Sequence, residues 1–293
     1  MSSDKLFVIV EGKDLDGRFY DQICSHSPSV SAAGYQVWLS EQIKDDVTGV
    51  GSAGKKAVLA HYEYFRSKRK LSVTTSSGKH SIAFMVDRDN EDYSGGRRRS
   101  PHVIYTQMFD AEAEAFFHGN DDVALANIFS LDMQSAKALA KDISGWVQDL
   151  ADLWQDWIIL CCLANKVGSR CDVGYGHESS INSPRYGPVD AALVADAEQR
   201  IGARSRCGSQ ACQVELAALR AKMLRAFARA DRQKLVKGKW LSNYLAHRAK
   251  EYFGTSPVLV KGAEVMAARA YLAACDFSEP WTRPYASRLE ALL

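Results

Sequence analysis

Two runs of apolar residues end abruptly in acidic residues, and this pairing constrains the fold more than any other feature of the chain. Residues 6–10 (LFVIV) run directly into Glu11, and residues 82–86 (IAFMV) run into Asp87 and Asp89. Continuous apolar runs with β-branched members are typical of strands that are buried on both faces. The sequence therefore predicts a sheet that is covered on both sides and carries carboxylates where its strands end.

The rest of the first 118 residues alternates between strand and helix patterns. Further strands are expected at residues 35–39 (YQVWL) and 102–105, and apolar residues at helical spacing predict short helices over 15–24 and around 58–65. Such alternation favours an α/β fold with a mostly parallel sheet, in which functional groups gather at the carboxyl ends of the strands.

Beyond residue 118 the strand signal fades and helical patterns dominate. A length of 293 residues permits two domains, and we predict a catalytic α/β domain over 1–118 and a helical domain over 119–293 that binds substrate or a partner. Residues 168–188, rich in Gly, Ser and Pro, are expected to form an exposed loop. Helices are expected at 121–167 (two or three), 189–202, 209–234, 239–252 and 262–275.

The charge of the chain is close to balanced in total but uneven along its length. The composition, 46% apolar and 25% charged, excludes wholesale disorder, and the formal net charge is only +2. Residues 107–157 hold ten acidic residues against two lysines, whereas residues 217–250 hold ten Lys and Arg against Asp231 alone. Near-neutrality therefore conceals a local basic segment, so it does not argue against a nucleic-acid partner.

Several other classes of protein are disfavoured by what the sequence lacks. There is no secretory signal pattern and no apolar run long enough to span a membrane, so we expect a cytoplasmic protein whose seven cysteines are reduced. The chain has no P-loop motif for ATP, and the GVGSAG segment does not follow a strand as a dinucleotide site would. A zinc site can be written with Cys171, His177, Cys207 and Cys212, but its spacing matches no compact zinc pattern.

The acidic residues at the two strand ends suit a divalent metal. Parallel strands end at the same edge of a sheet, so Glu11, Asp87 and Asp89 are expected to converge there, with Asp87 and Asp89 on the same side of an extended chain. Carboxylate oxygens are the ligands that Mg²⁺ and Mn²⁺ prefer. Gly12 would allow a metal or phosphate to approach the backbone closely. The alternative is that these residues are acidic only because loops at strand ends are polar.

Five segments carry a resemblance to a known family. FVIVEGKDLDGRFY (7–20) and FMVDRDNED (84–92) resemble the glutamate motif and the D-x-D motif of the Toprim domain. More narrowly, that first segment, together with GKKAVLAHYEYF (54–65) and VIYTQMFDAEAEAFF (103–117), is similar to the Toprim effectors of PARIS-type anti-phage systems, which are related to the OLD group of nucleases. KGKWLSNYL (237–245) also resembles a segment of that group.

The resemblance implies a function. It implies a Mg²⁺- or Mn²⁺-dependent endonuclease that cleaves phosphodiester bonds, with RNA, and tRNA in particular, favoured over DNA. Such a protein would be the toxic effector of an anti-phage defence system, held inactive by a separate ABC-type ATPase and active as a homodimer. The alternatives are a DNA nuclease of the OLD type and a noncatalytic Toprim module that binds nucleic acid or a partner protein.

The resemblance also implies roles for individual residues. Glu11, Asp87 and Asp89 would hold the metal, with Asp92 as a further candidate ligand, and Lys13 would contact a phosphate. Glu11 would also be placed to accept a proton from water, because a carboxylate beside a metal can act as a general base.

The glutamate motif departs from the pattern of related sequences in one respect. Those sequences place an acidic residue four positions after the glutamate and a phenylalanine seven positions after it. In this chain Asp16 and Phe19 come one position later. Whether Asp14 or Asp16 faces the metal is therefore left open.

Basic residues that follow or accompany these motifs are candidates for binding nucleic acid. Arg97, Arg98 and Arg99 lie in a Gly/Ser/Pro loop close to the D-x-D motif, and loops at strand ends often line active sites. Arg225 and Arg229 share one face of an amphipathic helix that could follow a phosphate backbone. This helix face could equally pair with the acidic 107–157 segment. Lys237 and Lys239, in the segment that resembles the OLD group, complete the set.

Overall fold

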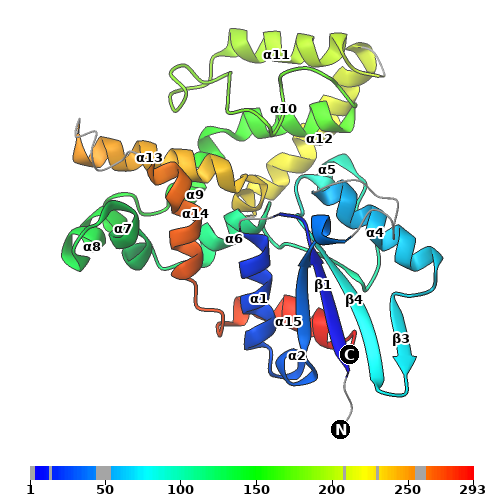
Figure 1. Cartoon of the computed structure of the whole chain (residues 1–293). Coiled ribbons are helices and arrows are strands. Elements are labelled where there is room, and N and C mark those ends of the chain that lie inside the picture. The colour runs from blue at the N-terminus through cyan, green and yellow to red at the C-terminus, as the bar shows by residue number, and fades with distance from the viewer. Residues whose placement is uncertain (1–3, 13–14, 44–53, 207–208, 229–230, 255–261) are drawn as a thin grey trace.

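The core of the first half is a five-stranded, mostly parallel sheet (Figure 1). The computed structural model describes residues 4–12, 15–43, 54–206, 209–228, 231–254 and 262–293. Strand β1 lies between β2 and β4, and all three run parallel, as does β5 beside the end of β4. Only β3 is antiparallel, paired with the beginning of β4. The strands are β1 (Lys5–Val10), β2 (Tyr35–Leu39), β3 (Ser72–Thr75), β4 (Gly78–Val86) and β5 (Val103–Tyr105).

Helices cover both faces of the sheet, as the uninterrupted apolar strands require. Alternate residues of the strands form two separate clusters: Val8 belongs to one and its neighbour Ile9 to the other. The first cluster packs against α1 and α15 through Phe19 and Tyr285, and the second packs against α4 through Tyr62. These helices and their short neighbours are α1 (Asp16–His26), α2 (Pro28–Ala33), η1 (Ser40–Gln42), α4 (Lys55–Ser67), α5 (Glu91–Ser94) and α15 (Arg283–Glu290).

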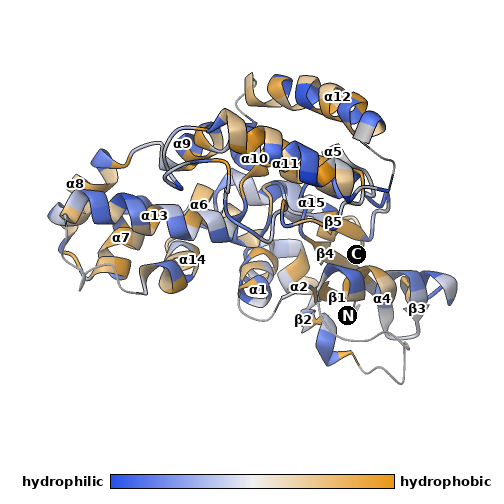
Figure 2. Ribbon diagram, turned by 90° about the horizontal axis from the view of Figure 1, so that it is seen from above, coloured by the Kyte–Doolittle hydropathy of each residue, from blue (hydrophilic) through white to orange (hydrophobic). Residues whose placement is uncertain are grey.

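A helical region lies beyond the carboxyl ends of the parallel strands (Figure 1). Eight consecutive side chains of α10, Trp157–Ala164, are buried. Helices α11 and α12 contact α10, whereas α7, α8 and α14 lie together to one side (Figure 2). The elements are α6 (Ala111–His118), α7 (Asp121–Phe129), α8 (Met133–Asp142), α9 (Trp146–Leu153), α10 (Gln155–Lys166), α11 (Ala191–Ala203), α12 (Ser209–Ala228), η2 (Arg232–Leu235), α13 (Gly238–Phe253), α14 (Ala263–Ala273) and η3 (Pro280–Thr282).

The end of the chain returns to the sheet. Helix α15 contacts α1 and α2, the Ser81 hydroxyl on β4 donates to the carbonyl of Leu292 at 2.7 Å, and the Ser27 hydroxyl donates to Glu290 at 2.8 Å. The buried carboxylate of Glu114 accepts the hydroxyl of Tyr285 as well. The division at residue 118 stays a prediction, but the last residues of the chain pack against the first half.

The predicted α/β class with a helical C-terminal region is confirmed, with differences in detail. Residues 121–166 form four helices, α7 to α10, where two or three were expected. Strand β3 was not expected, since its residues are all exposed and its pattern is polar. Residues 168–188 do form a loop, but it is not simply exposed: Val173 and Ile181 are buried, and Tyr175 stacks on Trp240 at 4.9 Å. Of the helices described, none has the length and apolar character needed to cross a bilayer.

Candidate functional site

The two acidic motifs meet at the carboxyl edge of the sheet. Strand β1 ends at Val10 and the adjacent β4 at Val86, so the residues that follow, Glu11 and Asp87, come together. The backbone N–H of Asp87 donates to Glu11 Oε1 at 2.8 Å. The Asp87 side chain in turn accepts the N–H of Ala111, at the start of α6, at 3.3 Å. The predicted convergence of the two motifs therefore holds for Glu11 and Asp87.

Two more carboxylates complete this cluster. Asp16, at the start of α1, accepts the backbone N–H of Gly12 at 2.7 Å, and Asp110 caps α6 by accepting the N–H of Ala113 at 2.8 Å. All four carboxylates line a single cleft of about 380 Å³. Its full lining is Glu11, Gly12, Asp16, Gly54, Asp87, Asp110, Ala111, Glu112 and Lys237. Asp16 thus faces the cluster, whereas Asp14 lies outside the described residues, as does Lys13.

The carboxylates of this cleft hold their protons more tightly than ordinary carboxyl groups. Burial raises the pKa of Glu11 from 4.5 to about 8, and the charges of Asp89 and Asp16 act in the same direction. Burial, followed by the charge of Glu11, raises the pKa of Asp87 well above its usual range, and burial does the same for Asp110. Buried like charges repel one another, so a cation in the cleft would be favourable.

One basic side chain, Lys237, enters the same cleft from the helical region. Its charge opposes the rise in the pKa of Asp110, and its Nζ donates to the carbonyl of Tyr175 at 3.3 Å. The next residue, Gly238, begins α13 and donates its N–H to Asp110. The 237–239 segment singled out in the sequence is therefore anchored at the carboxylate cleft, although Lys239 itself is exposed and faces a different hollow.

Asp89 does not point into this cleft with Asp87, contrary to the expectation from strand alternation. Strand β4 has already ended, and Asp89 adopts a left-handed conformation with φ of 48°. Its carboxylate forms an ion pair with Lys55 at 2.8 Å and lines a neighbouring hollow with Asn90 and Phe109. Alternation predicts side-chain direction only while the chain remains extended. Asp89 is nevertheless close enough for its charge to raise the pKa of Glu11.

Lys55 is a functional candidate that the sequence reasoning did not single out. Besides Asp89, its Nζ contacts Glu91 at 2.8 Å and the carbonyl of Asp87 at 2.5 Å. The pKa of Lys55 is raised by Asp89 and Glu91, which outweigh the opposing effect of burial. Its position in the sequence could have indicated it. Lys55 is the first residue of α4 and belongs to the GKK segment, which is part of the stretch that resembles the family.

The remaining predicted residues near the D-x-D motif form a network of their own. Asp92 forms ion pairs with Arg88 and Arg97, and Arg97 Nη1 lies 2.9 Å from Asp92 Oδ1. Asp92 therefore faces cations and not the cleft. Arg97 also stacks over the ring of Tyr105 at 4.7 Å. The structure therefore separates Asp92 from the carboxylates with which it was grouped.

The other two arginines of the 97–99 loop are exposed. Arg98 lies 3.5 Å from Glu63, and its backbone N–H donates to the hydroxyl of Tyr105 at 2.8 Å. Arg99 extends the same exposed loop. Both lie in the loop between the D-x-D motif and β5.

The basic C-terminal segment divides into two groups. Three arginines pair with the acidic segment: Arg220 with Asp156 at 3.5 Å, Arg232 with Asp152 at 3.2 Å and Arg248 with Asp149 at 3.3 Å. Also on α12, Lys222 reaches the carbonyl of Asp92 and the ring of Tyr93, and Arg225 is exposed. Pairing with the acidic segment is thus found for some of these residues, and nucleic-acid binding by Arg225 stays a prediction; Arg229 lies outside the described part.

The carboxylate cleft has the donor chemistry for Mg²⁺ or Mn²⁺ but no ready-made cage. Within the described residues, no three His, Cys, Asp or Glu side chains are arranged to hold an ion. Mg²⁺ commonly binds to one or two carboxylates and completes its shell with water and substrate phosphate. Glu11 and Asp87, with Asp16 beside them, fit that requirement, because they offer only oxygen atoms and repel one another when ionised.

Comparison with protein-family models, with curated proteins and with solved structures gave no significant match.

Proposed function

We propose that this protein is a divalent-metal-dependent nuclease whose active site is the carboxylate cleft. The observation that carries the proposal is the gathering of Glu11, Asp16, Asp87 and Asp110 around one cleft with Lys237. Buried carboxylates with strongly raised pKa values often mark functional sites. The Toprim-like motifs at 7–20 and 84–92 support the same conclusion, because they contribute Glu11 and Asp87.

The residues of the cleft would have different roles in phosphodiester hydrolysis. Mg²⁺ or Mn²⁺ held by Glu11 and Asp87 would neutralise phosphate oxygens and promote attack by water. Glu11, once ionised, is placed to accept a proton at its carboxylate oxygens. Lys237 would contact the phosphate, since it lines the cleft immediately before α13. Asp110 keeps Lys237 in position by anchoring the N–H of Gly238.

The biological setting is proposed on resemblance. By analogy with the Toprim effectors of PARIS-type systems, the substrate would be RNA, tRNA in particular, and the protein a toxic anti-phage effector. A separate ABC-type ATPase would hold it inactive, and the active form would be a homodimer in the cytoplasm. DNA is the alternative substrate.

A noncatalytic binding module is the second candidate, and one contact favours it. Lys55 neutralises Asp89 and Glu91 without any metal, so part of the acidic motif is already satisfied by the protein. The same ion pairs would also suit an inactive form of a nuclease effector, in which part of the acidic motif is neutralised by Lys55.

Incubation of the purified protein with tRNA and with plasmid DNA, in Mg²⁺, Mn²⁺ or EDTA, tests the proposal. We expect metal-dependent cleavage that Glu11→Ala and Asp87→Ala each reduce by at least a hundredfold. Asp142→Ala, which removes an exposed carboxylate on α8, is the matched control and should cleave normally. Equal cleavage by all variants would refute the assignment, and absence of cleavage with every metal would favour the binding module.

A further inference from the structure

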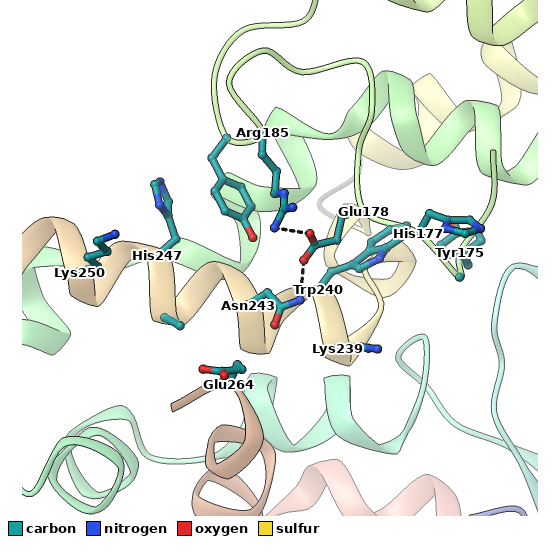
Figure 3. A pocket seen from close by; sticks show the side chains of 13 residues that line it. Tyr175, His177, Glu178, Arg185, Lys239, Trp240, Asn243, His247, Lys250 and Glu264 are labelled. Atoms are coloured by element: carbon teal, nitrogen blue, oxygen red, sulfur yellow. Dashed lines mark hydrogen bonds and ion pairs between the residues drawn. The ribbon is translucent and has the colours of Figure 1, made fainter. Parts of the chain in front are cut away.

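A second hollow, of about 530 Å³, lies between the loop that follows α10 and helix α13 (Figure 3). The loop contributes residues 175–178, Arg185 and Tyr186, and α13 contributes residues from Lys239 to Lys250. Its size is within the range of about 300–1,000 Å³ that is usual for small-ligand sites. The proposed active site does not account for it.

Aromatic rings form one wall of this hollow. Tyr186 lies in a stack of three rings, with Trp154 on one side at 5.6 Å and His247 on the other at 4.4 Å. The His247 ring also lies 6.1 Å from that of Tyr244, its Nε2 lies 3.4 Å from Glu251, and about a third of its side chain is exposed. Burial lowers the pKa of His247, so the ring is neutral at pH 7 and suits stacking on a flat, uncharged surface.

Cations lie at both ends of the hollow. In Figure 3, Lys250 and His247 lie at one end, and Lys239 lies with His177 at the other. Lys239 and Lys250 are exposed, and neither has an ion pair within the part of the chain that the structure describes.

Polar groups between the two ends are held in place. Glu178 accepts from Asn243 and pairs with Arg185 at 2.5 Å, so the charge of Arg185 is balanced within the wall. The exposed carboxylate of Glu264, on α14, also lines the hollow. An anionic ligand would therefore have to place its charges at the two lysine ends.

The hollow is continuous with the surroundings of the carboxylate cleft. Tyr175 lines both this hollow and the one that contains Asp89, and its carbonyl accepts the Nζ of Lys237, which lines the cleft itself. Lys237 and Lys239 are separated by one residue at the start of α13. A strand whose phosphate contacts Lys237 can thus extend along α13 towards Lys250.

We propose that this hollow binds a short unpaired stretch of the substrate strand, with one base against His247 and phosphates of successive nucleotides on Lys239 and Lys250. Proteins that bind single strands combine aromatic platforms for the bases with cations for the backbone, as here. The inference rests on the proposed nuclease function and assigns that function a substrate subsite outside the cleft.

Binding of a fluorescent single-stranded RNA oligonucleotide, followed by anisotropy in EDTA, tests the subsite without cleavage. The Lys239→Ala/Lys250→Ala variant should bind about tenfold more weakly. Because two phosphate contacts are lost, its salt slope should be shallower by about 1.4. Lys137→Ala/Lys141→Ala, which removes the same charge from exposed positions on α8, should bind as the wild type does.

An abasic version of the oligonucleotide tests the stacking contact. The wild type should bind it about fivefold more weakly than the intact strand, His247→Ala should not distinguish the two, and His247→Phe should restore the difference. The proposal is overturned if the wild type does not bind, if the two double-lysine variants bind alike, or if His247→Ala still distinguishes the strands. A single-stranded DNA probe shows whether the subsite also accepts deoxyribose.

The subsite and the nuclease activity can fail separately. Metal-dependent cleavage that depends on Glu11, together with unchanged RNA binding in the Lys239→Ala/Lys250→Ala variant, would overturn the subsite alone. Lysine- and His247-dependent binding without cleavage in any metal would overturn the nuclease and retain a nucleotide-binding hollow.

Discussion

Gly238 lies so close to Glu112 that a Cβ on Gly238 would sit 2.2 Å from the Cβ of Glu112. The same Cβ would also lie 2.8 Å from Asp110 Oδ1 and from the backbone nitrogen of Ala113. Helix α13 can therefore begin against α6 only because this residue has no side chain. This close approach brings Lys237 to the carboxylate cleft.

Gly238→Ala should consequently separate α13 from α6. We expect a loss of stability of about 1–3 kcal/mol or more from overpacking, together with loss of cleavage, because Lys237 and Asp110 would no longer be aligned. Thermal unfolding and the tRNA cleavage assay measure the two effects. Gly174→Ala is the control, since a Cβ there meets nothing within 4 Å. Similar melting temperatures for both variants would contradict the close packing.

The raised pKa of Glu11 predicts that the metal-free protein loses stability as the pH rises. Unfolded Glu11 ionises near its ordinary pKa of 4.5, whereas folded Glu11 keeps its proton up to about pH 8. Between these values the folded state binds more protons, so the free energy of unfolding falls with rising pH. The loss is on the order of a few kcal/mol, because one pKa unit corresponds to about 1.4 kcal/mol.

Thermal unfolding from pH 5 to pH 8.5, with and without Mg²⁺, measures this dependence. Mg²⁺ should stabilise the wild type more at pH 8 than at pH 5, because the metal binds the ionised carboxylates. Glu11→Gln should flatten the pH dependence in EDTA and reduce the stabilisation by Mg²⁺. A flat profile for the wild type in EDTA would mean that Glu11 is ionised throughout this range.

The parts of the site that could be predicted from the sequence are those that follow directly from the strands. Apolar β1 and β4 had to lie inside the sheet, and parallel pairing then brings Glu11 and Asp87 to the same edge. The direction of Asp89 could not be predicted in this way, because it depends on a left-handed residue just beyond the strand.

Contacts between distant segments account for most of what the sequence did not reveal. The return of α15 to the sheet depends on pairs such as Ser81 and Leu292, which leave no local pattern. The contact between Gly238 and α6 likewise depends on the packing of two helices. The KGK segment nevertheless indicated which residues approach the cleft. The hollow beside α13 is formed partly by the 168–188 loop. The composition of this loop predicted that it is exposed but not that it lines a hollow.

Lys55 provides a third prediction, since it is a cation already bound to the acidic motif. Lys55→Ala would leave Asp89 and Glu91 without their shared partner. The metal-free variant should be less stable than the wild type, and its apparent affinity for Mn²⁺ should rise several-fold, because the ammonium charge that acts on Glu11 no longer opposes a cation in the cleft. Titration calorimetry with Mn²⁺ measures the affinity. Lys56→Ala, at the exposed next position, should change neither quantity, and an unchanged affinity in Lys55→Ala would exclude competition.

The two groups of basic residues in the C-terminal segment should respond differently to mutation. Arg225 is exposed on α12 close to Lys222, which contacts residues 92 and 93, whereas Arg232 is paired with Asp152. Arg225→Ala should weaken RNA binding by about two- to fivefold and make its salt slope shallower by about 0.7, the value for one phosphate contact on a single strand. Arg232→Ala should leave the salt slope unchanged and cost at most about 1 kcal/mol of stability, because the ion pair is partly exposed. Binding isotherms at several salt concentrations, together with thermal unfolding, separate these effects. If both variants shift the salt slope equally, the ion pair with Asp152 does not prevent Arg232 from contacting RNA.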